Sequence, residues 1–309
     1  MKNKNNTNEP SGLLLINKHA GVTSHDIVNQ IRKLYGTRRV GHTGTLDPMA
    51  TGVLVVLIGR AAKAAEYLAS DSKRYSATLQ LGLTTDSEDT TGNILTRSDR
   101  IPSFEELTAV LPRFRGKIQQ IPPMYSALKI NGQKLVDLAR RGETVERQAR
   151  EIEIFDLVAT QTNDPDKVIL DIACSGGTYI RTLCADIGHA LGCGGAMASL
   201  QRTEACGYSI SDSYTIAQLE KYTQAEREDL LIPTEDLFKD LAAIALPAFY
   251  ERLFRNGCEI YLNKINRSLP IGTRVRICDA NHTFFALGEV REYENGPAIK
   301  SIKMFFTEA

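Results

Sequence analysis

A loop with three glycines leads directly into a run of six apolar residues, and this junction constrains the fold most strongly. The loop covers residues 39–52 and the apolar run covers residues 53–58. A short apolar run between polar segments is typical of a buried strand, and loops beside rigid strands commonly carry functional side chains. Pro48 favours an extended backbone at Asp47, which follows His42 by five residues. An ordinary turn with a capping aspartate explains the same residues without any function.

The composition indicates a globular protein with one large domain or two. The chain has 309 residues, of which 42% are hydrophobic and 24% are charged, as is usual for globular proteins. Its 37 basic and 37 acidic residues give a formal net charge of zero. This balance argues against a nucleic-acid-binding surface over the whole chain, but it allows a local one.

The termini and the cysteines suggest an intracellular protein. No apolar run is long enough for a membrane helix. Residues 1–10 are polar and lack the apolar core of a signal peptide, so we expect a disordered tail and a cytoplasmic location. The six cysteines form no C-x-x-C pair and no zinc-ligand pattern with histidine. We therefore expect reduced thiols and no metal site.

Hydrophobic periodicity predicts strands and helices along the whole chain. The predicted strands cover residues 12–18, 75–82, 151–158, 167–174 and 199–205. The predicted helices cover residues 24–35, 60–70, 103–111 and 179–191, with capping residues at Thr23 or Ser24, at Ser103 and at Thr178.

Three further segments complete the predicted organisation. Residues 84–100 are acidic and rich in turn formers, so we expect an exposed loop there. Residues 217–240 are acidic, and we expect them to be mostly helical. Short strands at residues 271–277 and 283–290 predict a small β-rich domain over residues 245–309, after a larger domain over residues 11–244.

Residues 113–150 form the most basic segment. They include nine basic and three acidic residues, which gives the segment a net charge of +6. In its middle, residues 121–127 contain two prolines, a methionine and a tyrosine, which do not suit a helix interior. Basic residues interleaved with apolar and aromatic ones suit a phosphate backbone and an unstacked base. The alternative is an ordinary solvated helix face at residues 134–141.

Arg181 stands in the predicted first turn of the helix that follows Thr178. The helix dipole opposes a positive charge at this end. We therefore expect Arg181 to have an anionic partner, although an exposed arginine is the simpler alternative.

Five short motifs follow one another along the chain. They are GLLLINK at 12–18, GHTGTLDP at 41–48, KRY at 73–75, PPMYSA at 122–127 and GTYIR at 177–181. Their sequences, order and spacing resemble the bacterial tRNA pseudouridine synthases of the TruB family over most of residues 12–205. The C-terminal domain resembles, by its position alone, the PUA-like RNA-binding domain of these enzymes.

The resemblance implies a fold and a reaction. The implied fold is α+β, with a mixed, largely antiparallel central sheet flanked by helices around a basic cleft. The implied reaction converts uridine 55 in the T-loop of tRNA into pseudouridine. The implied partner is the T-arm of tRNA, and we expect a monomer. Because the reaction breaks and remakes one bond within one substrate, we expect no cofactor and no metal.

The resemblance also implies three catalytic residues. Asp47 matches the family's catalytic aspartate, which could add to C6 of uracil, add to C1′ of ribose, or assist proton loss from the sugar. Arg181 matches the arginine that pairs with this aspartate and favours its ionised form. Tyr75 matches the active-site tyrosine, which can pack against the base or assist a proton transfer.

Five further residues match or suit substrate contacts. By resemblance, His42 contacts the substrate near the gap that a flipped base leaves in the stack. Tyr179 and Leu200 match pocket-lining positions, although without the resemblance both suit a core. Lys18 and Lys129 could contact phosphate or buttress the cleft.

Two other functions remain open at this point. The chain could be a tRNA-binding and folding module whose catalysis is dispensable. It could also be an aspartate-dependent hydrolase of a glycosidic bond. Such enzymes usually use two carboxylates, and only Asp47 is expected in the candidate site.

Overall fold

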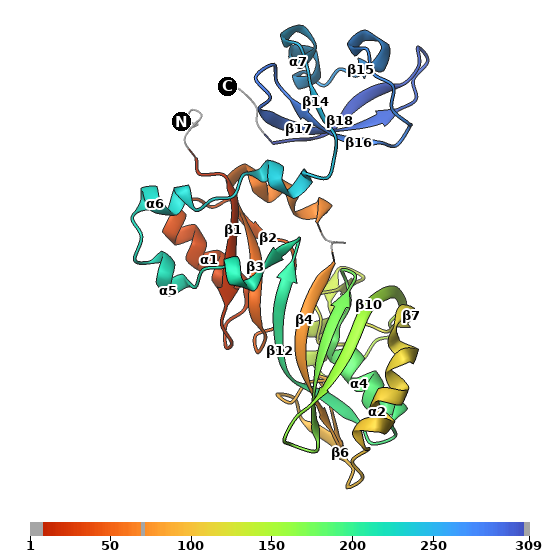
Figure 1. The fold of residues 1–309 in the computed structure, drawn as a ribbon. Helices are drawn as coiled ribbons and strands as arrows, with labels where there is room; N and C mark the ends of the chain where they lie inside the picture. Colours follow the sequence, from red (N-terminus) through yellow and green to blue (C-terminus); the bar gives the residue numbers. More distant parts are fainter. Residues whose placement is uncertain (1–8, 69–71, 306–309) are drawn as a thin grey trace.

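The computed structural model describes residues 9–68 and 72–305 and contains a large and a small β-sheet domain (Figure 1). Residues 1–8 of the expected tail lie outside the described residues. Glu9 is placed, and its Oε2 atom lies 2.9 Å from Nη1 of Arg39.

A mixed, largely antiparallel sheet of nine strands forms the large domain. Its main path runs in the order β1 (Gly12–Lys18), β3 (Thr51–Ile58), β12 (Gly195–Ala205), β4 (Lys73–Leu81), β11 (Lys167–Cys174), β10 (Arg150–Gln161) and β7 (Gly116–Gln120). Short strands β2 (Val40–His42) and β13 (Tyr208–Ser209) pair with β3 and β12, respectively. Only the β3–β12 pair is parallel along this path. The predicted α+β architecture is therefore confirmed.

The apolar run 53–58 is buried on both faces of the sheet. Alternate side chains point to opposite faces of a strand. One face of β3 enters the main core of the large domain through Leu54, Val56 and Ile58. The other face enters a second core through Val53, Val55 and Leu57. Burial on both faces explains why this strand shows no polar alternation.

The predicted helix boundaries hold where capping residues define them. Helix α1 (Ser24–Tyr35) begins after a capping box at Thr23 and ends at Gly36 in the left-handed conformation. Helix α2 (Phe104–Val110) begins after a capping box at Ser103 and continues into the 3₁₀ helix η2 (Leu111–Phe114).

Two helix predictions need correction. The helix expected at 60–70 is a 3₁₀ helix, η1 (Gly59–Tyr67), and Ser70 lies outside the described residues. Helix α4 (Ile180–Ala190) has Tyr179, not Thr178, at its N-cap position. The Thr178 hydroxyl instead donates to the Ser175 carbonyl at 3.0 Å. Helix α4 packs on β12 and β4.

The prediction of an exposed loop at 84–100 is wrong in part. Strands β5 (Leu83–Thr85) and β6 (Ile94–Arg97) pair as a hairpin. Between them the chain folds inward, so that Ser87 and Asp89 are buried. The backbone there pairs with Met197 of β12. The acidic composition of this segment predicted exposure. Composition does not show which turn residues pack against a distant strand, so it did not predict the burial of Ser87 and Asp89.

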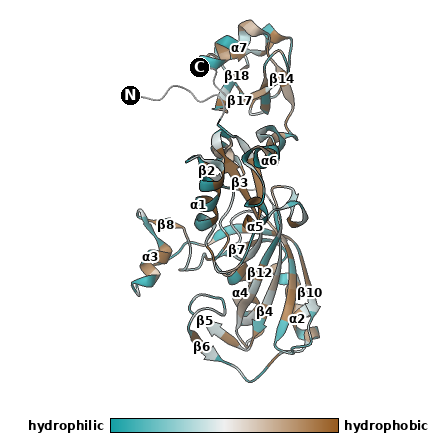
Figure 2. Cartoon of the chain, turned by 90° about the vertical axis from the view of Figure 1, so that its left-hand side faces the viewer, coloured by the Kyte–Doolittle hydropathy of each residue, from teal (hydrophilic) through white to brown (hydrophobic). Residues whose placement is uncertain are grey.

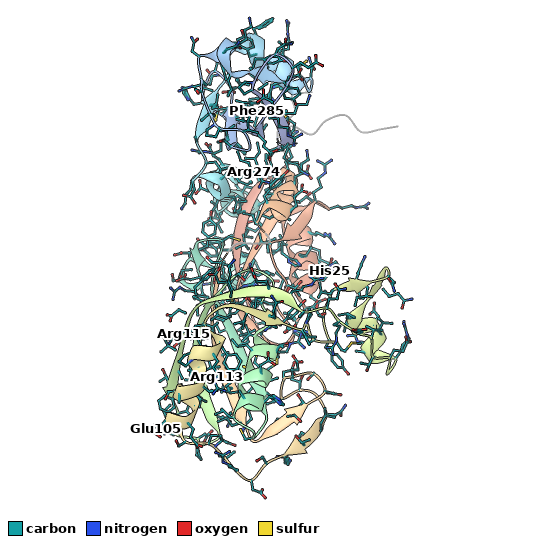
Figure 3. All side chains as sticks on the ribbon, turned by 90° about the vertical axis from the view of Figure 1, so that its right-hand side faces the viewer. His25, Glu105, Arg113, Arg115, Arg274 and Phe285 are labelled. Carbon is teal, nitrogen blue, oxygen red and sulfur yellow. The ribbon has the colours of Figure 1, made fainter. Side chains whose placement is uncertain are left out.

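The basic segment 113–150 does not form one continuous surface. Its central part, with β8 (Lys129–Ile130), β9 (Gln133–Lys134) and α3 (Leu135–Arg140), forms an arm that projects from the large domain (Figure 2). Arg113 and Arg115 lie on the opposite side of that domain (Figure 3). The charges of this segment therefore lie on different sides of the large domain.

The C-terminal domain is a sheet of five strands. Their order is β14 (Ala243–Ala245), β16 (Arg274–Cys278), β17 (Phe284–Arg291), β18 (Ala298–Met304) and β15 (Ile260–Tyr261). Helix α7 (Ala248–Arg255) and the 3₁₀ helix η5 (Leu262–Ile265) complete the domain. The sheet begins at Ala243, two residues before the expected boundary.

Short helices and an aromatic cluster connect the two domains. Residues 210–238 form helices of three to six residues, namely η3 (Ile210–Asp212), α5 (Ile216–Leu219), α6 (Gln224–Asp229) and η4 (Thr234–Phe238). Phe238 then packs against Phe284 and Phe305 of the small domain. These rings belong to the same core as one face of β3. In the described parts of the chain, no helix has the length and apolar character needed to cross a membrane.

Candidate active site

The loop between β2 and β3 holds Asp47 through contacts with α1 and β1. The Ser24 hydroxyl bonds both the backbone nitrogen and the carbonyl of Leu46, at 2.9 and 3.1 Å. The Ala50 nitrogen donates to the Asp47 carbonyl at 3.0 Å. These hydrogen bonds hold the backbone at Leu46 and Asp47 and so fix the position of Asp47.

Lys18 buttresses this loop from inside the protein. Its side chain is fully buried, and Nζ donates to the carbonyls of His19, Pro48 and Ala50 at 3.0, 3.3 and 2.6 Å. Burial lowers the pKa of Lys18 to about 8, although the charge of Asp47 opposes this change. Of the two roles expected for Lys18, the structure supports buttressing. A phosphate contact is wrong because protein atoms enclose the ammonium group.

Gly52 allows β3 to approach β12 closely. Its φ of 105° favours glycine, and a Cβ atom at this position would lie 2.2 Å from the Arg202 carbonyl oxygen. The glycine at the end of the loop therefore has a packing role, which positions β12 against the loop that carries Asp47.

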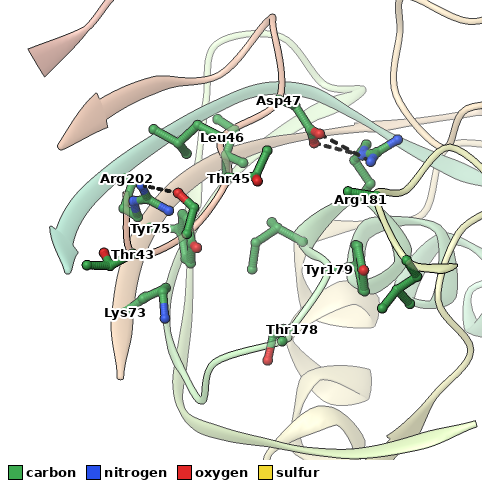
Figure 4. Close-up of a pocket in the computed structure, with 16 residues that line it drawn as sticks. Thr43, Thr45, Leu46, Asp47, Lys73, Tyr75, Thr178, Tyr179, Arg181 and Arg202 are labelled. Atoms are coloured by element: carbon green, nitrogen blue, oxygen red, sulfur yellow. Dashed lines mark hydrogen bonds and ion pairs between the residues drawn. The ribbon is translucent and has the colours of Figure 1, made fainter. Parts of the chain in front are cut away.

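Five of the predicted site residues line one cavity of about 370 Å³ (Figure 4). They are Asp47, Tyr75, Tyr179, Arg181 and Leu200. They come from the β2–β3 loop, β4, the start of α4 and β12. The cavity has a size typical of a small-ligand site.

Arg181 joins two carboxylates. Its Nε atom lies 2.9 Å from Asp47 Oδ2, and its Nη2 atom lies 3.3 Å from Asp47 Oδ1. Its Nη1 atom lies 3.8 Å from Oδ2 of the buried Asp89. Carbonyls of Ser87 and Tyr125 accept from the same guanidinium at 3.1 and 2.8 Å. The expectation of an anionic partner for Arg181 is confirmed, whereas the expectation of a single carboxylate in the site is wrong.

Burial and neighbouring charges have opposing effects on the pKa of the Asp47 carboxyl. Burial raises the pKa of the Asp47 carboxyl, Arg181 opposes this increase, and the charge of Asp89 adds to it. The Asp47 side chain is 33% exposed, whereas that of Arg181 is 6% exposed. The carboxylate is thus the accessible member of a pair whose cation is enclosed by protein.

The two tyrosines of the cavity are held by different means. Tyr75 is buried in β4, opposite Arg202 of β12. Burial raises the pKa of its hydroxyl, although the charge of Arg202 opposes this increase. Tyr179 is held through its backbone, because the Gln120 side chain donates to its carbonyl and accepts from its nitrogen at 3.0 and 2.8 Å.

Comparison with known proteins identifies the family. Residues 32–180 match the TruB family pseudouridylate synthase N-terminal domain, and residues 181–239 match the tRNA pseudouridylate synthase B C-terminal domain. The tRNA pseudouridine synthase B of Alkaliphilus oremlandii (strain OhILAs) is 40% identical over 299 residues, which cover 96% of this chain and 99% of that protein. The chain belongs to the TruB family of pseudouridylate synthases. It is therefore an isomerase.

Other relatives agree with this assignment. The protein of the same name from Francisella tularensis subsp. novicida (strain U112) is 40% identical over 310 residues, which cover 99% of this chain and 97% of that one. A solved structure titled as a Cbf5-Nop10-Gar1 complex matches 97% of this chain and 86% of its own, with a TM-score of 0.72 and 22% identity. At that identity the likeness shows the fold alone.

Besides the buried Lys18, two predicted site residues of this TruB-family chain lie outside the cavity lining. His42 ends β2, one residue before the lining begins at Thr43. Burial lowers the pKa of its imidazole, and the charge of Arg202 acts in the same direction, which favours the neutral ring. Lys129 is exposed on β8 of the arm, so a phosphate contact at this position stays a prediction.

A groove of about 930 Å³ opens on the arm side of the Asp47–Arg181 pair. Both members of the pair line it, as do Asp89, Tyr125 and Arg140. Arg140 is exposed on α3. The arm of this TruB-family chain therefore brings an unburied cation to the rim of the site.

Sequence reasoning missed three charged residues of the site. Arg202 and Lys73 line the cavity and are 1% and 7% exposed. Period-two spacing could have indicated them, because Arg202 shares a strand face with Leu200, and Lys73 shares one with Tyr75. Asp89 lies in a turn-rich segment, where no such spacing pattern indicated a place in the site.

Proposed function

We propose that this chain isomerises uridine 55 in the T-loop of tRNA to pseudouridine, with Asp47 as the catalytic carboxylate. One observation carries the proposal: Asp47 is the accessible carboxylate of the cavity, and the enclosed Arg181 holds both of its oxygens. The names of the relatives, tRNA pseudouridine synthase B, support tRNA as the substrate. We expect the protein to act in the cytoplasm as a monomer.

The chemistry needs an ionised, positioned carboxylate. Asp47 could add to C6 of uracil, add to C1′ of ribose, or assist proton loss from the sugar. Arg181 favours the ionised form through its charge and fixes the orientation through its planar fork. Arg181 is therefore proposed to act at the reacting atoms through Asp47.

The target base must leave the RNA stack before it can reach this cavity. Extrusion costs a few kcal/mol, which contacts with the flipped base and the opened stack must offset. We propose that Tyr75 packs against the extruded base, with Tyr179 and Leu200 completing the pocket. His42, one residue outside the lining, is proposed to contact the RNA where the base has left the stack.

The test uses Asp47→Asn, which keeps the side-chain shape and removes the charge. The variant is incubated with unmodified tRNA transcript, and pseudouridine at position 55 is mapped chemically. We expect no product and a retained Kd for tRNA. The matched control is Asp171→Asn on an exposed position of β11, which should remain active. Full activity of Asp47→Asn would sink the assignment, and free uracil in place of pseudouridine would indicate hydrolysis.

A second candidate is tRNA binding and folding with dispensable catalysis. The projecting arm with its exposed cations favours this candidate, because an extended basic element can grip RNA without chemistry. In cells that lack the protein, rescue by Asp47→Asn would support it. Failure of that variant, with rescue by the wild-type chain, would support catalysis as the required activity.

A further inference from the structure

The end of the cavity away from Asp47 is lined by two cations. Lys73 of β4 and Arg202 of β12 lie on this side, and Tyr75 lies between them and the Asp47–Arg181 pair (Figure 4). Both cations are more than nine-tenths buried. The cavity therefore has a carboxylate paired with arginine at one end and two basic side chains at the other.

Arg202 is held in place by backbone carbonyls. Its Nε atom donates to the Val53 carbonyl at 2.7 Å, and its Nη2 atom donates to the Gly44 carbonyl at 3.1 Å. No carboxylate among residues 9–68 and 72–305 forms an ion pair with it. A guanidinium has five N–H groups. The two carbonyls accept from two of them, and the Tyr75 hydroxyl also hydrogen-bonds to Arg202. Burying a cation without a counter-charge is costly, so a negatively charged partner in the cavity would explain its presence.

We propose that Arg202, with Lys73 beside it, stabilises the negative charge that the uracil ring carries while it is detached from ribose. This inference rests on the proposed function. When the N1–C1′ bond breaks, its electron pair stays on uracil and spreads over N1, O2 and O4. Meanwhile C1′ is bonded to Asp47, or C2′ gives a proton to Asp47 and a C1′–C2′ double bond forms. Asp47 is released, or the proton returns to C2′, when the ring is rejoined. When C5 bonds to C1′, the C5 proton leaves and N1 gains a proton, so the product is an isomer of the substrate.

Because of the symmetry of uracil, the same cations can stabilise the ring at both steps of the reaction. These steps are cleavage of the N1–C1′ bond and formation of the C5–C1′ bond. Half a turn of the ring about its C6–N3 axis exchanges N1 with C5 and O2 with O4. The edge opposite the reacting atoms therefore presents a carbonyl oxygen before and after the turn. Arg202 can stabilise either oxygen without moving, as a preorganised group does.

The expected effect of removing this charge is large on the rate and small on binding. The uracil anion exists only during the reaction, so Arg202→Gln should lower the single-turnover rate by about 10²-fold. The Kd for tRNA should stay nearly unchanged, because the interaction forms only after bond cleavage. Arg202→Lys retains the charge and should recover part of the rate.

The decisive experiment varies the leaving group. Fluorine at C5 stabilises the uracil anion by itself, so cleavage of 5-fluorouridine at position 55 should depend less on Arg202. Single-turnover loss of the target nucleoside is measured by mass spectrometry for wild-type protein and Arg202→Gln on both tRNAs. We expect the defect of the variant to shrink about tenfold or more on the fluorinated tRNA. An equal defect on both tRNAs overturns the proposal.

Matched variants separate this role from a structural one. Arg74→Gln removes an exposed charge from the same strand as Lys73, and its rate ratio between the two tRNAs should match that of wild type. Melting curves check folding. If Arg202→Gln does not fold, the same ratio is measured with Lys73→Gln, and an equal defect on both tRNAs again overturns the proposal. If wild-type protein forms no pseudouridine, the proposed function itself fails, which is a separate result.

Discussion

Arg181 lies 3.8 Å from Asp89, measured from Nη1 to Oδ2, and both side chains are more than nine-tenths buried. The same guanidinium contacts the more exposed Asp47. Asp89 is itself held by the backbone nitrogen and hydroxyl of Thr91, at 3.0 and 2.6 Å. The turn at residues 85–93 therefore orients Asp89, and Asp89 helps to orient Arg181. Arg181 in turn holds the candidate catalytic carboxylate of Asp47.

Asp89→Asn should lower the rate of pseudouridine formation about tenfold, equivalent to about 1.4 kcal/mol of transition-state stabilisation. The substitution removes a charge that orients Arg181, but it leaves the cavity lining intact, so the Kd for tRNA should not change. Single-turnover assays and tRNA binding measure the two effects. The control is Asp86→Asn in the same turn, because Asp86 bonds Asn93 rather than Arg181. Equal rates for the two variants would contradict this role of Asp89.

The rate should fall at low pH through protonation of Asp47. Because burial raises the pKa of this carboxyl, its proton is lost at a higher pH than that of an ordinary aspartate. The ionised fraction and the rate should both rise with pH through this raised pKa. The charge of Asp89 contributes to the increase, so Asp89→Asn should move the acidic limb to lower pH. A limb that moves to higher pH in this variant would be inconsistent with the assignment.

Lys18→Met should destabilise the fold by about 1–3 kcal/mol, because buried carbonyls of the Asp47 loop lose their donor. Burial lowers the pKa of Lys18 from 10.5 to about 8, so between these values the unfolded chain binds more protons than the folded one. The unfolding free energy of wild type should therefore rise with pH in this window relative to the variant.

Chemical denaturation on both sides of the lowered pKa measures this difference. Lys33→Met, on the exposed face of α1, is the control and should show neither effect. A constant difference between wild type and Lys18→Met across the window would show that Lys18 does not titrate there.

Neutralising the arm should flatten the salt dependence of tRNA binding. If Arg140 neutralises one phosphate, Arg140→Gln should reduce the slope of log K against log salt by about 0.7–0.9. Arg141 should contribute less, because its Nε atom already lies 2.7 Å from Glu143. Arg113→Gln removes an equal charge on the far side of the large domain (Figure 3) and should leave the slope unchanged. Equal slopes for all three variants would mean that the arm is only a solvated surface.

The sequence by itself predicted the helices and strands whose boundaries depend on neighbouring residues. Capping boxes at Thr23 and Ser103 and the apolar run 53–58 predicted α1, α2 and β3, because caps and periodicity act within a few residues. The segment 60–70 showed a helical apolar pattern, but this pattern did not distinguish a 3₁₀ helix from an α-helix. The motifs and their order were enough to indicate the TruB family and to name Asp47, Tyr75 and Arg181.

Only the tertiary structure decided which charged residues face the cavity. Strand β12 lies far from β3 and β4 in the sequence, and its pairing with both strands places Arg202 between Gly52 and Tyr75. Docking of an acidic turn on β12 buries Asp89 beside Arg181. A charged residue can be buried only where distant groups supply its partners, so its residue type alone predicts it to be exposed. Lys18 shows the same principle, because the sequence left open a phosphate contact or a buttressing role, and the structure shows Lys18 bound to the carbonyls of the loop that presents Asp47.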